Sequence, residues 1–357
     1  MTSLIISSPP IEWEAIIENI SSGRTILCLG PELLTRDGKS IDELLREAVG
    51  PQAKAYDDGL FYFGGSDIVA YSKIKRLYQQ PFPELEEILE KIARIPFQIL
   101  IPLTPDHHLE KSFENQQFAF QHATYVRRKS APEIADPTRD LPLIYHLLGE
   151  IEQRESLVLT HDDLYDFFES VIEHRSMPEL LQSRIKEAYN YIFIGLPFEK
   201  WYMQLLLRVL GQHTNKNALK YAANHAFDTG IQAFCYEQFN ILCVPDHIGD
   251  FVTELHNRCE AEGLLRGSGG PSPLKTIAKG LVGKDKLREA LDKLLDHYET
   301  ELPGDSESMN FLLSLSARLT RLEDKVGRGS IDSRDANVER AQIRDSLLDF
   351  ISQMPEL

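Results

Sequence analysis

Cysteine is scarce in this 357-residue chain: Cys28, Cys235, Cys243 and Cys259 are scattered, and none of them forms a C-x-x-C pair. This pattern excludes a cysteine-based zinc knuckle and favours a reducing compartment. No apolar run approaches the roughly 20 residues that a membrane-spanning helix needs. The first residues also lack the basic segment and apolar core of a secretion signal. We therefore expect a cytoplasmic protein that has no contact with a membrane.

Basic residues are also outnumbered, with 38 lysines and arginines against 55 aspartates and glutamates and a formal net charge of −17. A general nucleic-acid binder needs a basic stripe, and no basic run in this sequence outweighs the acidic background. We therefore expect proteins or small molecules as partners and no nucleic acid.

Short apolar runs alternate with helical patterns over the first two-thirds of the chain. The runs at 24–30, 97–104, 118–125, 155–160, 191–195 and 239–244 are typical of buried parallel strands. Between them, the stretch at 40–49 begins with a Ser-x-x-Glu capping pattern, and the stretch at 82–95 has one apolar face. Strands that alternate with helices predict an α/β fold with a Rossmann-like, doubly wound parallel sheet. Ligands of such folds bind beyond the carboxyl ends of the strands.

The composition changes at 266–274, where Gly, Ser and Pro dominate as they do in flexible linkers. Beyond it the pattern predicts three amphipathic helices and, because they are joined by short connections, a small bundle rather than a coiled coil. Their apolar stripes contain Leu287, Leu291, Leu294 and Tyr298, then Leu312, Leu315, Leu319, Leu322 and Val326, then Val338, Ile343, Leu347 and Ile351. We predict an α/β domain at 1–265, a linker at 266–274 and a helical domain at 275–357.

Two clusters of acidic and imidazole groups follow predicted strands, D-H-H at 106–108 and H-D-D at 161–163. Such groups are ligands for zinc or manganese, and the first tripeptide is similar to that of DHH-type phosphoesterases. Those enzymes need further aspartates at strand ends, which the segment CLGPELL lacks, and adjacent histidines point in different directions. The second cluster is typical of an acid-rich helix N-terminus. We therefore expect no metal.

Four longer segments carry more information when they are taken together. They are 24–34 with its glycine turn, TPDHHLEKSF after the strand at 97, LIYHLLGEIEQRESLVLTHDDLYDFF at 143–168, and YIFIGLPFEKWYMQLLLRVL at 191–210. In order and spacing they resemble the sirtuin-like domains of bacterial defence proteins over residues 10–265. That family has a GAG turn, a TN strand end, an HG motif before an LT–DDY segment, and a late LGYSLRDW-like motif. The resemblance implies an NAD pocket and, in active members, cleavage of the nicotinamide–ribose bond.

The chain departs from this family where the cleavage needs its groups. The transition state is oxocarbenium-like, so it requires a base near the ribose hydroxyls and a side-chain amide that orients the sugar or the water. The resemblance places the base at Leu148 and the amide at Pro105, and neither side chain can fill that role. His146 lies two residues before Leu148, a shift of about 7 Å along a strand. His107 and His161 remain open as alternative bases.

The glycine turn departs as well, because it reads Gly30–Pro31–Glu32 and would set a carboxylate beside the NAD pyrophosphate. We therefore predict no catalytic residue and no bound cofactor. A vestigial pocket that still admits NAD or a related nucleotide would comprise Gly30, Pro31, Glu32, Thr104 and Gly195.

The helical tail carries a second set of motifs. Asn310, the run LSARLTRLE, N-x-E-R at 337–340 and Ile343–Arg344 with LLDFI are similar to the effector-associated domains of bacterial conflict-system proteins. The resemblance implies a death-fold-like module that pairs with a matching domain on a partner protein, and it leaves room for a homo-oligomer. The predicted partner surface comprises Arg318, Arg321, Glu339, Arg340 and Arg344, since arginine is enriched at interfaces. A solvated charged face remains the alternative for these residues.

Two functions follow. The favoured one is a catalytically inactive sirtuin-like adaptor or regulator in an anti-phage conflict system, which recruits a partner effector through its helical domain. The alternative is an active NAD glycohydrolase that depletes NAD during infection.

Overall fold

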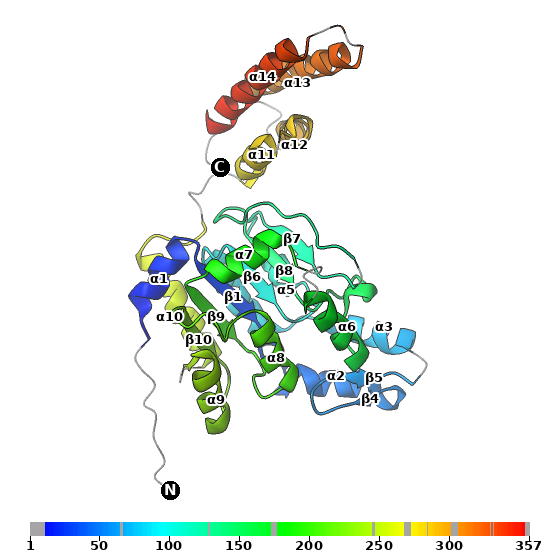
Figure 1. Ribbon diagram of the computed structural model, residues 1–357, viewed down its shortest axis with the longest axis vertical. Coiled ribbons are helices and arrows are strands. Elements are labelled where there is room, and N and C mark those ends of the chain that lie inside the picture. Colours follow the sequence, from blue (N-terminus) through cyan, green and yellow to red (C-terminus); the bar gives the residue numbers. More distant parts are fainter. Residues whose placement is uncertain are drawn as a thin grey trace. The chain divides into compact units, whose positions relative to one another are not determined.

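The computed structural model describes residues 11–64, 67–127, 129–172, 177–244, 247–267, 273–283, 285–300, 306–328, 330 and 332–353. The chain divides into two compact units, residues 1–266 and 267–357, and each is considered separately (Figure 1). Most of the predicted linker, residues 268–272, lies outside the described residues.

The first unit is built on a seven-stranded parallel sheet with the strand order β11-β10-β9-β1-β6-β8-β7. Its strands are β1 (Thr25–Leu29), β6 (Ile99–Pro102), β7 (Gln121–Thr124), β8 (Leu143–His146), β9 (Asn190–Ile194), β10 (Leu219–Ala223) and β11 (Leu242–Cys243). Two hairpins lie outside the sheet, β2 (Thr35–Arg36) with β3 (Lys39–Ser40), and β4 (Lys54–Ala55) with β5 (Phe61–Tyr62). The predicted α/β class is confirmed.

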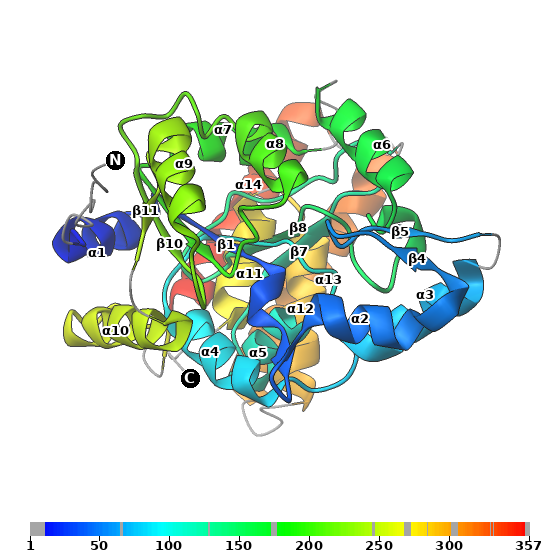
Figure 2. The same cartoon turned by 90° about the horizontal axis from the view of Figure 1, so that it is seen from below.

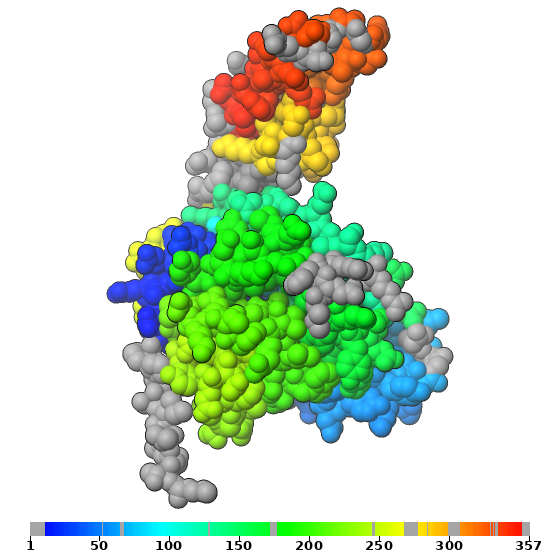
Figure 3. All heavy atoms as spheres, viewed as in Figure 1, coloured from blue at the N-terminus to red at the C-terminus, as the bar shows by residue number. Residues whose placement is uncertain are grey.

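Helices cover both faces of the sheet. They are α1 (Trp13–Ser21), α2 (Ile41–Val49), α3 (Asp67–Tyr78), α4 (Pro83–Arg94), α5 (His108–Asn115), α6 (His161–Ile172), α7 (Glu179–Glu187), α8 (Trp201–Val209), α9 (Thr229–Phe239) and α10 (Ile248–Ala261). The side chains of β1 alternate: Leu27 and Leu29 join the core beneath α4, α5 and α10, and Ile26 and Cys28 join the core beneath α6 to α9. Figure 2 shows these two helix layers, and Figure 3 shows that α7, α8 and α9 cover the strands on one side.

Several local signals of the sequence are confirmed. Ser40 and Glu43 form a reciprocal capping box at the start of α2. Asp163 accepts hydrogen bonds from the backbone N–H groups of Leu159 and Thr160, so the acid-rich stretch is the N-terminus of α6. In turn, Oγ1 of Thr160 accepts the backbone N–H of Asp163 at 3.2 Å, which satisfies a donor of the first helical turn that would otherwise lack a partner.

Two strand predictions need correction. The run at 155–160 is not a strand: it begins as the 3-10 helix η3 (Arg154–Ser156), and only Thr160 forms a bridge, to Phe61. Conversely, β10 was not predicted because Lys220 interrupts its apolar run. Lys220 is nevertheless buried, since its Nζ donates to two backbone carbonyls, and burial lowers the pKa of Lys220 to about 8.

The second unit contains four helices among its described residues, not the three that were predicted. They are α11 (Pro273–Gly283), α12 (Leu287–Thr300), α13 (Ser306–Gly327) and α14 (Ser333–Gln353). α11 begins at Pro273, inside the predicted linker at 266–274, and contributes Ala278 and Val282 to the core. The other stripes are buried as predicted except Val326 and Val338, which are both 53% exposed. In the described part of the chain, no helix has the length and apolarity needed to span a membrane.

Candidate functional site

The topology brings the ends of the central strands together at one edge of the sheet. β1 lies between β9 and β6, and β8 lies beyond β6. The residues that follow these strands therefore converge: Pro31, Thr104, Pro105 and Leu148 all line one cavity. The sequence-predicted pocket positions are thus neighbours in space, at the edge where this fold class binds ligands.

The two glycines at this edge are required by the backbone itself. A Cβ on Gly30 would lie 2.1 Å from the carbonyl oxygen of Gly195, a contact that no side chain can make. Gly195 also has a φ of +69°, which favours glycine. Gly30 donates its N–H to Ile194 at 2.8 Å, so the turns after β1 and β9 touch directly. Close packing of two turns explains both glycines without a ligand.

The turn after β1 offers no backbone donors to a phosphate. It forms the 3-10 helix η1 (Pro31–Leu33), and Pro31 has no N–H. The N–H of Glu32 donates to Gly195 at 3.0 Å, and the N–H of Leu33 donates to Gly30 at 3.3 Å. A nucleotide phosphate needs free N–H groups at such a turn, and here they are bonded within the chain.

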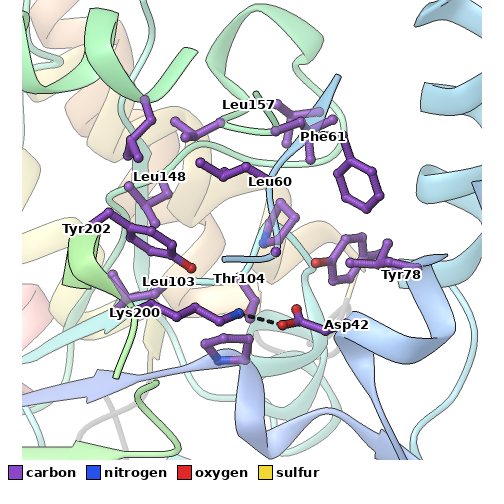
Figure 4. A pocket seen from close by; sticks show the side chains of 17 residues that line it. Asp42, Leu60, Phe61, Tyr78, Leu103, Thr104, Leu148, Leu157, Lys200 and Tyr202 are labelled. Carbon is purple, nitrogen blue, oxygen red and sulfur yellow. Dashed lines mark hydrogen bonds and ion pairs between the residues drawn. The ribbon is translucent and has the colours of Figure 1, made fainter. Parts of the chain in front are cut away.

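The cavity itself is small and mostly apolar. Its volume is about 80 Å³, whereas pockets that bind drug-sized ligands measure roughly 300–1,000 Å³. Figure 4 shows Leu60, Leu103, Leu148 and Leu157 among its lining side chains. NAD is larger than a typical drug-sized ligand, so the cavity in this structure is much smaller than a pocket that encloses NAD.

The ionisable side chains at the cavity are either paired or neutral. Lys200 and Asp42 form an ion pair at 2.5 Å (Figure 4). Burial raises the pKa of Tyr78 well above its ordinary value, and it raises the pKa of Tyr202 as well. Both phenols therefore stay neutral at physiological pH. Among the described residues that line the cavity, none supplies an unpaired general base.

Glu32 lies beside this cavity and is partly buried. Burial and the nearby Glu199 carboxylate raise the pKa of Glu32 to about 7. Near neutral pH this carboxyl group is therefore a mixture of its protonated and its charged form, so its charge alone does not decide whether the turn accepts an anion.

The alternative bases do not line the cavity. Nε2 of His161 faces Asp58 at 2.9 Å, and the indole N–H of Trp201 donates to the same carboxylate oxygen at 2.9 Å. His146 is fully buried at the end of β8. His161 and Trp201 therefore form a group with Asp58.

The side chains of the D-H-H motif at 106–108 point in different directions, as predicted. Asp106 accepts the backbone N–H of His108 at 3.0 Å and so begins α5. The His108 ring packs edge-on against Phe82, with ring centroids 5.5 Å apart. His107 turns the other way and meets side chains that the sequence did not connect with it.

We use "histidine cluster" for His107, Glu110, His122 and His146, which meet on one face of the sheet beneath α5. Oε1 of Glu110 lies 3.5 Å from Nδ1 of His107, 3.1 Å from Nδ1 of His122 and 2.5 Å from Nε2 of His146. Glu150 lies next to the cluster, with Oε2 2.6 Å from Nε2 of His122. Only one local signal was present in the sequence, the i,i+3 spacing of His107 and Glu110, and it does not point to His122 or His146.

The charges in the histidine cluster support one another. The hydrogen bonds to Glu110 and then to Glu150 raise the pKa of His122 to about 9, and the hydrogen bond to Glu110 raises the pKa of His107. Burial alone would raise the pKa of Glu110, but the three imidazoles hold it well below its usual range. Glu150 likewise has a lowered pKa, because His122 outweighs its burial.

In the second unit, three of the five predicted partner residues have intramolecular partners. Arg340 pairs with Asp285 at 2.8 Å, and Glu339 lies 3.7 Å from Lys325. Arg344 contacts its neighbour Asp345 at 3.4 Å. Arg321 and Arg344 are exposed, and Arg318 is partly buried. A role of these residues in partner binding stays a prediction.

Comparison with known proteins agrees with both resemblances. A family model described as "SIR2-like domain" matches residues 106–241, and one described as "Effector-associated domain 11" matches residues 273–355. Among curated proteins, no sequence matches this chain. The chain therefore carries a SIR2-like domain followed by an effector-associated domain.

Solved structures that are similar to the chain include Sir2 proteins. One is described as "Structural Basis for the Mechanism and Regulation of Sir2 Enzymes", with 9% identity, coverage of 71% of this chain and 98% of that chain, and a TM-score of 0.39. Another is a Sir2 variant described with a deacetylated p53 peptide and 3'-O-acetyl ADP-ribose, with 12% identity, coverage of 71% and 100%, and a TM-score of 0.36.

Proposed function

We propose that this chain is a catalytically silent SIR2-like protein that acts as an adaptor or regulator in a bacterial anti-phage conflict system. Its effector-associated domain recruits a partner effector that bears a matching domain. The SIR2-like unit senses or assembles without cleaving NAD.

One observation carries the loss of catalysis: the strand-end cavity of about 80 Å³ is lined by apolar side chains at the positions where the family keeps its reactive groups. Leu148 takes the place of the base and Pro105 that of the amide. Cleavage without a base and an orienting amide loses two contributions, of which general acid–base catalysis alone is worth about 10²–10⁴-fold.

The limits of the family match support the same proposal. The SIR2-like match begins at residue 106, so the glycine turn at 30–32 and Pro105 both lie outside it. These segments hold part of the predicted pocket, whereas Leu148 and Gly195 lie inside the match.

The catalytic half of the proposal is tested by incubating the purified full chain with NAD and following nicotinamide release. We expect no release above a heat-treated sample, with an active NAD glycohydrolase as the positive control. Release that disappears in His161→Ala, but persists in the exposed-imidazole control His247→Ala, would establish the alternative function and refute a silent domain.

The adaptor half is tested by recovery of partners from the native host with the full chain as bait. Arg321→Ala combined with Arg344→Ala should weaken recovery of a protein that carries an effector-associated domain. The matched control is Arg328→Ala, which removes an exposed arginine of the same unit outside the predicted surface. An unchanged partner list for the double variant would count against the predicted surface.

A further inference from the structure

The three rings of the histidine cluster are arranged regularly. Its ring centroids form a nearly equilateral triangle, with separations of 5.6 Å for His107–His122, 5.4 Å for His107–His146 and 5.3 Å for His122–His146. One nitrogen of each ring points to the same carboxylate oxygen of Glu110. Three imidazoles from a helix start and two strands thus converge on one point.

The carboxylate of Glu110 is used in an uneven way. Three nitrogens crowd around Oε1, while Oε2 is buried and has no hydrogen-bond partner among the described residues. A buried carboxylate that served only as a hydrogen-bond acceptor would share its donors between both oxygens, because an unsatisfied buried acceptor costs about 1–3 kcal/mol. The arrangement is that of ligands that face a common centre.

The second nitrogen of each ring, the one that does not point to Glu110, also faces an oxygen atom. Nδ1 of His146 faces the carbonyl oxygen of Thr104 at 3.2 Å, and Nε2 of His122 faces Glu150 at 2.6 Å. Nε2 of His107 also points to Glu150, at 3.8 Å. Metal-bound histidines almost always direct their second nitrogen to a carbonyl or a carboxylate, which fixes the tautomer and the ring orientation.

The spacing of the ligand atoms fits a tetrahedral ion. Ligand atoms at 2.0–2.1 Å from a tetrahedral Zn²⁺ lie about 3.3 Å from one another. One ligand atom from each of the four side chains can be chosen so that all lie within 4.8 Å of one another. His107 and His122 are partly exposed, so small rotations can close the set, and the same opening provides an entry path.

The charge of the site also matches a divalent cation. Glu110 and Glu150 bring two negative charges into a buried place, where unpaired charge is strongly disfavoured. Metals bind imidazole in its neutral form, so in a loaded site the ion takes over the pairing with these carboxylates that His107 and His122 provide without it. Carboxylate with imidazole is a ligand set suited to zinc and its neighbours among the first-row metals.

We propose that Nδ1 of His107, Nδ1 of His122, Nε2 of His146 and Oε1 of Glu110 form a closed structural site for one Zn²⁺-class ion, with Glu150 as the outer carboxylate. The ion ties the start of α5 to β7 and β8. Through His146 and Thr104 it also fixes the strand end that borders the small cavity. The sequence argument against a metal weighed the adjacent His107 and His108, and only the first of these belongs to the histidine cluster.

The test uses the full chain, stripped with a chelator and dialysed, with Zn²⁺ alone as the probe. Wild type should bind one Zn²⁺ per chain by elemental analysis, and its melting temperature should rise on loading. Glu150→Gln keeps the shape of the outer group but lowers Zn²⁺ affinity by about 10–100-fold. His122→Gln removes a ligand and lowers the affinity further.

The matched control is His161→Gln, because His161 is also paired with a carboxylate and its side chain is 30% exposed, against 33% for His122. This control should bind Zn²⁺ as wild type does. Loading with Co²⁺ should give the visible absorption of a tetrahedral site in wild type and in the control, and not in His122→Gln. If His122→Gln does not fold, Glu150→Gln decides by itself.

Three results would overturn the site. They are the failure of wild type to bind Zn²⁺ at micromolar concentration, equal affinity in wild type and both cluster variants, and loss of the ion in His161→Gln. The first result would leave the cluster as protonated imidazoles paired with carboxylates. None of these results bears on NAD cleavage, so this inference and the proposed function fail separately.

Discussion

Arg266 anchors the last segment of the first unit and offers a sharp test of how that unit is held together. Its side chain is almost completely buried and donates hydrogen bonds to the carbonyl oxygens of Arg139 and Ala93, both at 2.8 Å, and of Ile95 at 2.5 Å. It also donates to Phe97. Arg266 is the first residue of the predicted linker at 266–274, but its burial assigns it to the first unit, which ends there.

We expect Arg266→Met to lower the free energy of unfolding of the first unit by about 3–5 kcal/mol. The variant removes a donor from four carbonyls. Ile95 keeps the N–H of Phe97 at 2.8 Å, and each buried carbonyl that becomes unsatisfied costs about 1–3 kcal/mol. Part of that loss is offset. Burial lowers the pKa of Arg266 to about 9, so burying its charge costs free energy in the folded state, and the substitution removes that cost. Methionine keeps the apolar volume over Phe113, so the missing hydrogen bonds dominate.

The assay is urea unfolding of the full chain followed by tryptophan fluorescence. The only tryptophans, Trp13 and Trp201, both lie in the first unit, so the signal reports on that unit alone. With a slope of about 3 kcal/mol per M of urea, the midpoint should fall by roughly 1–1.7 M.

The matched control for Arg266 is Arg24, an exposed arginine whose guanidinium lies 4.9 Å from the ring centre of Tyr189, much as Arg266 lies 5.3 Å from that of Phe113. Arg24→Met should cost only about 0.5–1 kcal/mol. Equal effects of the two substitutions would refute the reasoning, because they would assign the loss to stacking and not to the buried carbonyls.

Three further predictions concern the cleft and the bundle. Burial raises the pKa of Glu32 to about 7 in the folded state. Its contribution to the free energy of unfolding is therefore complete below the unfolded pKa and is lost as pH rises through 7. Relative to Glu32→Gln, the free energy of unfolding of wild type should fall by at most about 3 kcal/mol between pH 5 and 8 in chemical denaturation. Gly30→Ala should destabilise the first unit strongly, since its Cβ would meet Gly195, whereas Gly249→Ala in α10 meets no atom within 4 Å and should be neutral or slightly stabilising in the same assay. Leu319→Ala should remove about 2–5 kcal/mol from the helical unit, seen by circular dichroism, and leave the tryptophan transition unchanged.

The parts of the fold that sequence predicts are those where neighbouring residues carry the signal. β1 and β9 are continuous apolar runs because both faces are covered by helices, and the Ser40 box marks a helix start locally. β10 does not show in the sequence, because the carbonyls that pair with its buried Lys220 belong to Gln212 and Phe239, 8 and 19 residues away. A buried lysine can be recognised only after its acceptors are in place.

The candidate sites divide in the same way. The departures at Pro105 and Leu148 are visible in the sequence because a motif fixes their positions, and the topology then brings both to one cavity. The histidine cluster is invisible because its ligands come from a helix, an edge strand and the strand beside it, up to 39 residues apart (107 to 146). No short spacing encodes that meeting.

If the proposed function and the proposed metal site both hold, the first unit has exchanged reactivity for rigidity. Active sites hold polar groups in positions that weaken the fold, and replacement of such groups by apolar ones commonly stabilises it. Leu148 and Pro105 make that replacement at the strand ends, while the glycine turns pack on each other and leave little space for a ligand. If a metal fixes the neighbouring start of α5, these strand ends are held more rigidly still. A rigid edge of the sheet can present an unchanging surface to a partner. Partners would then be selected by surface residues and by the helical domain.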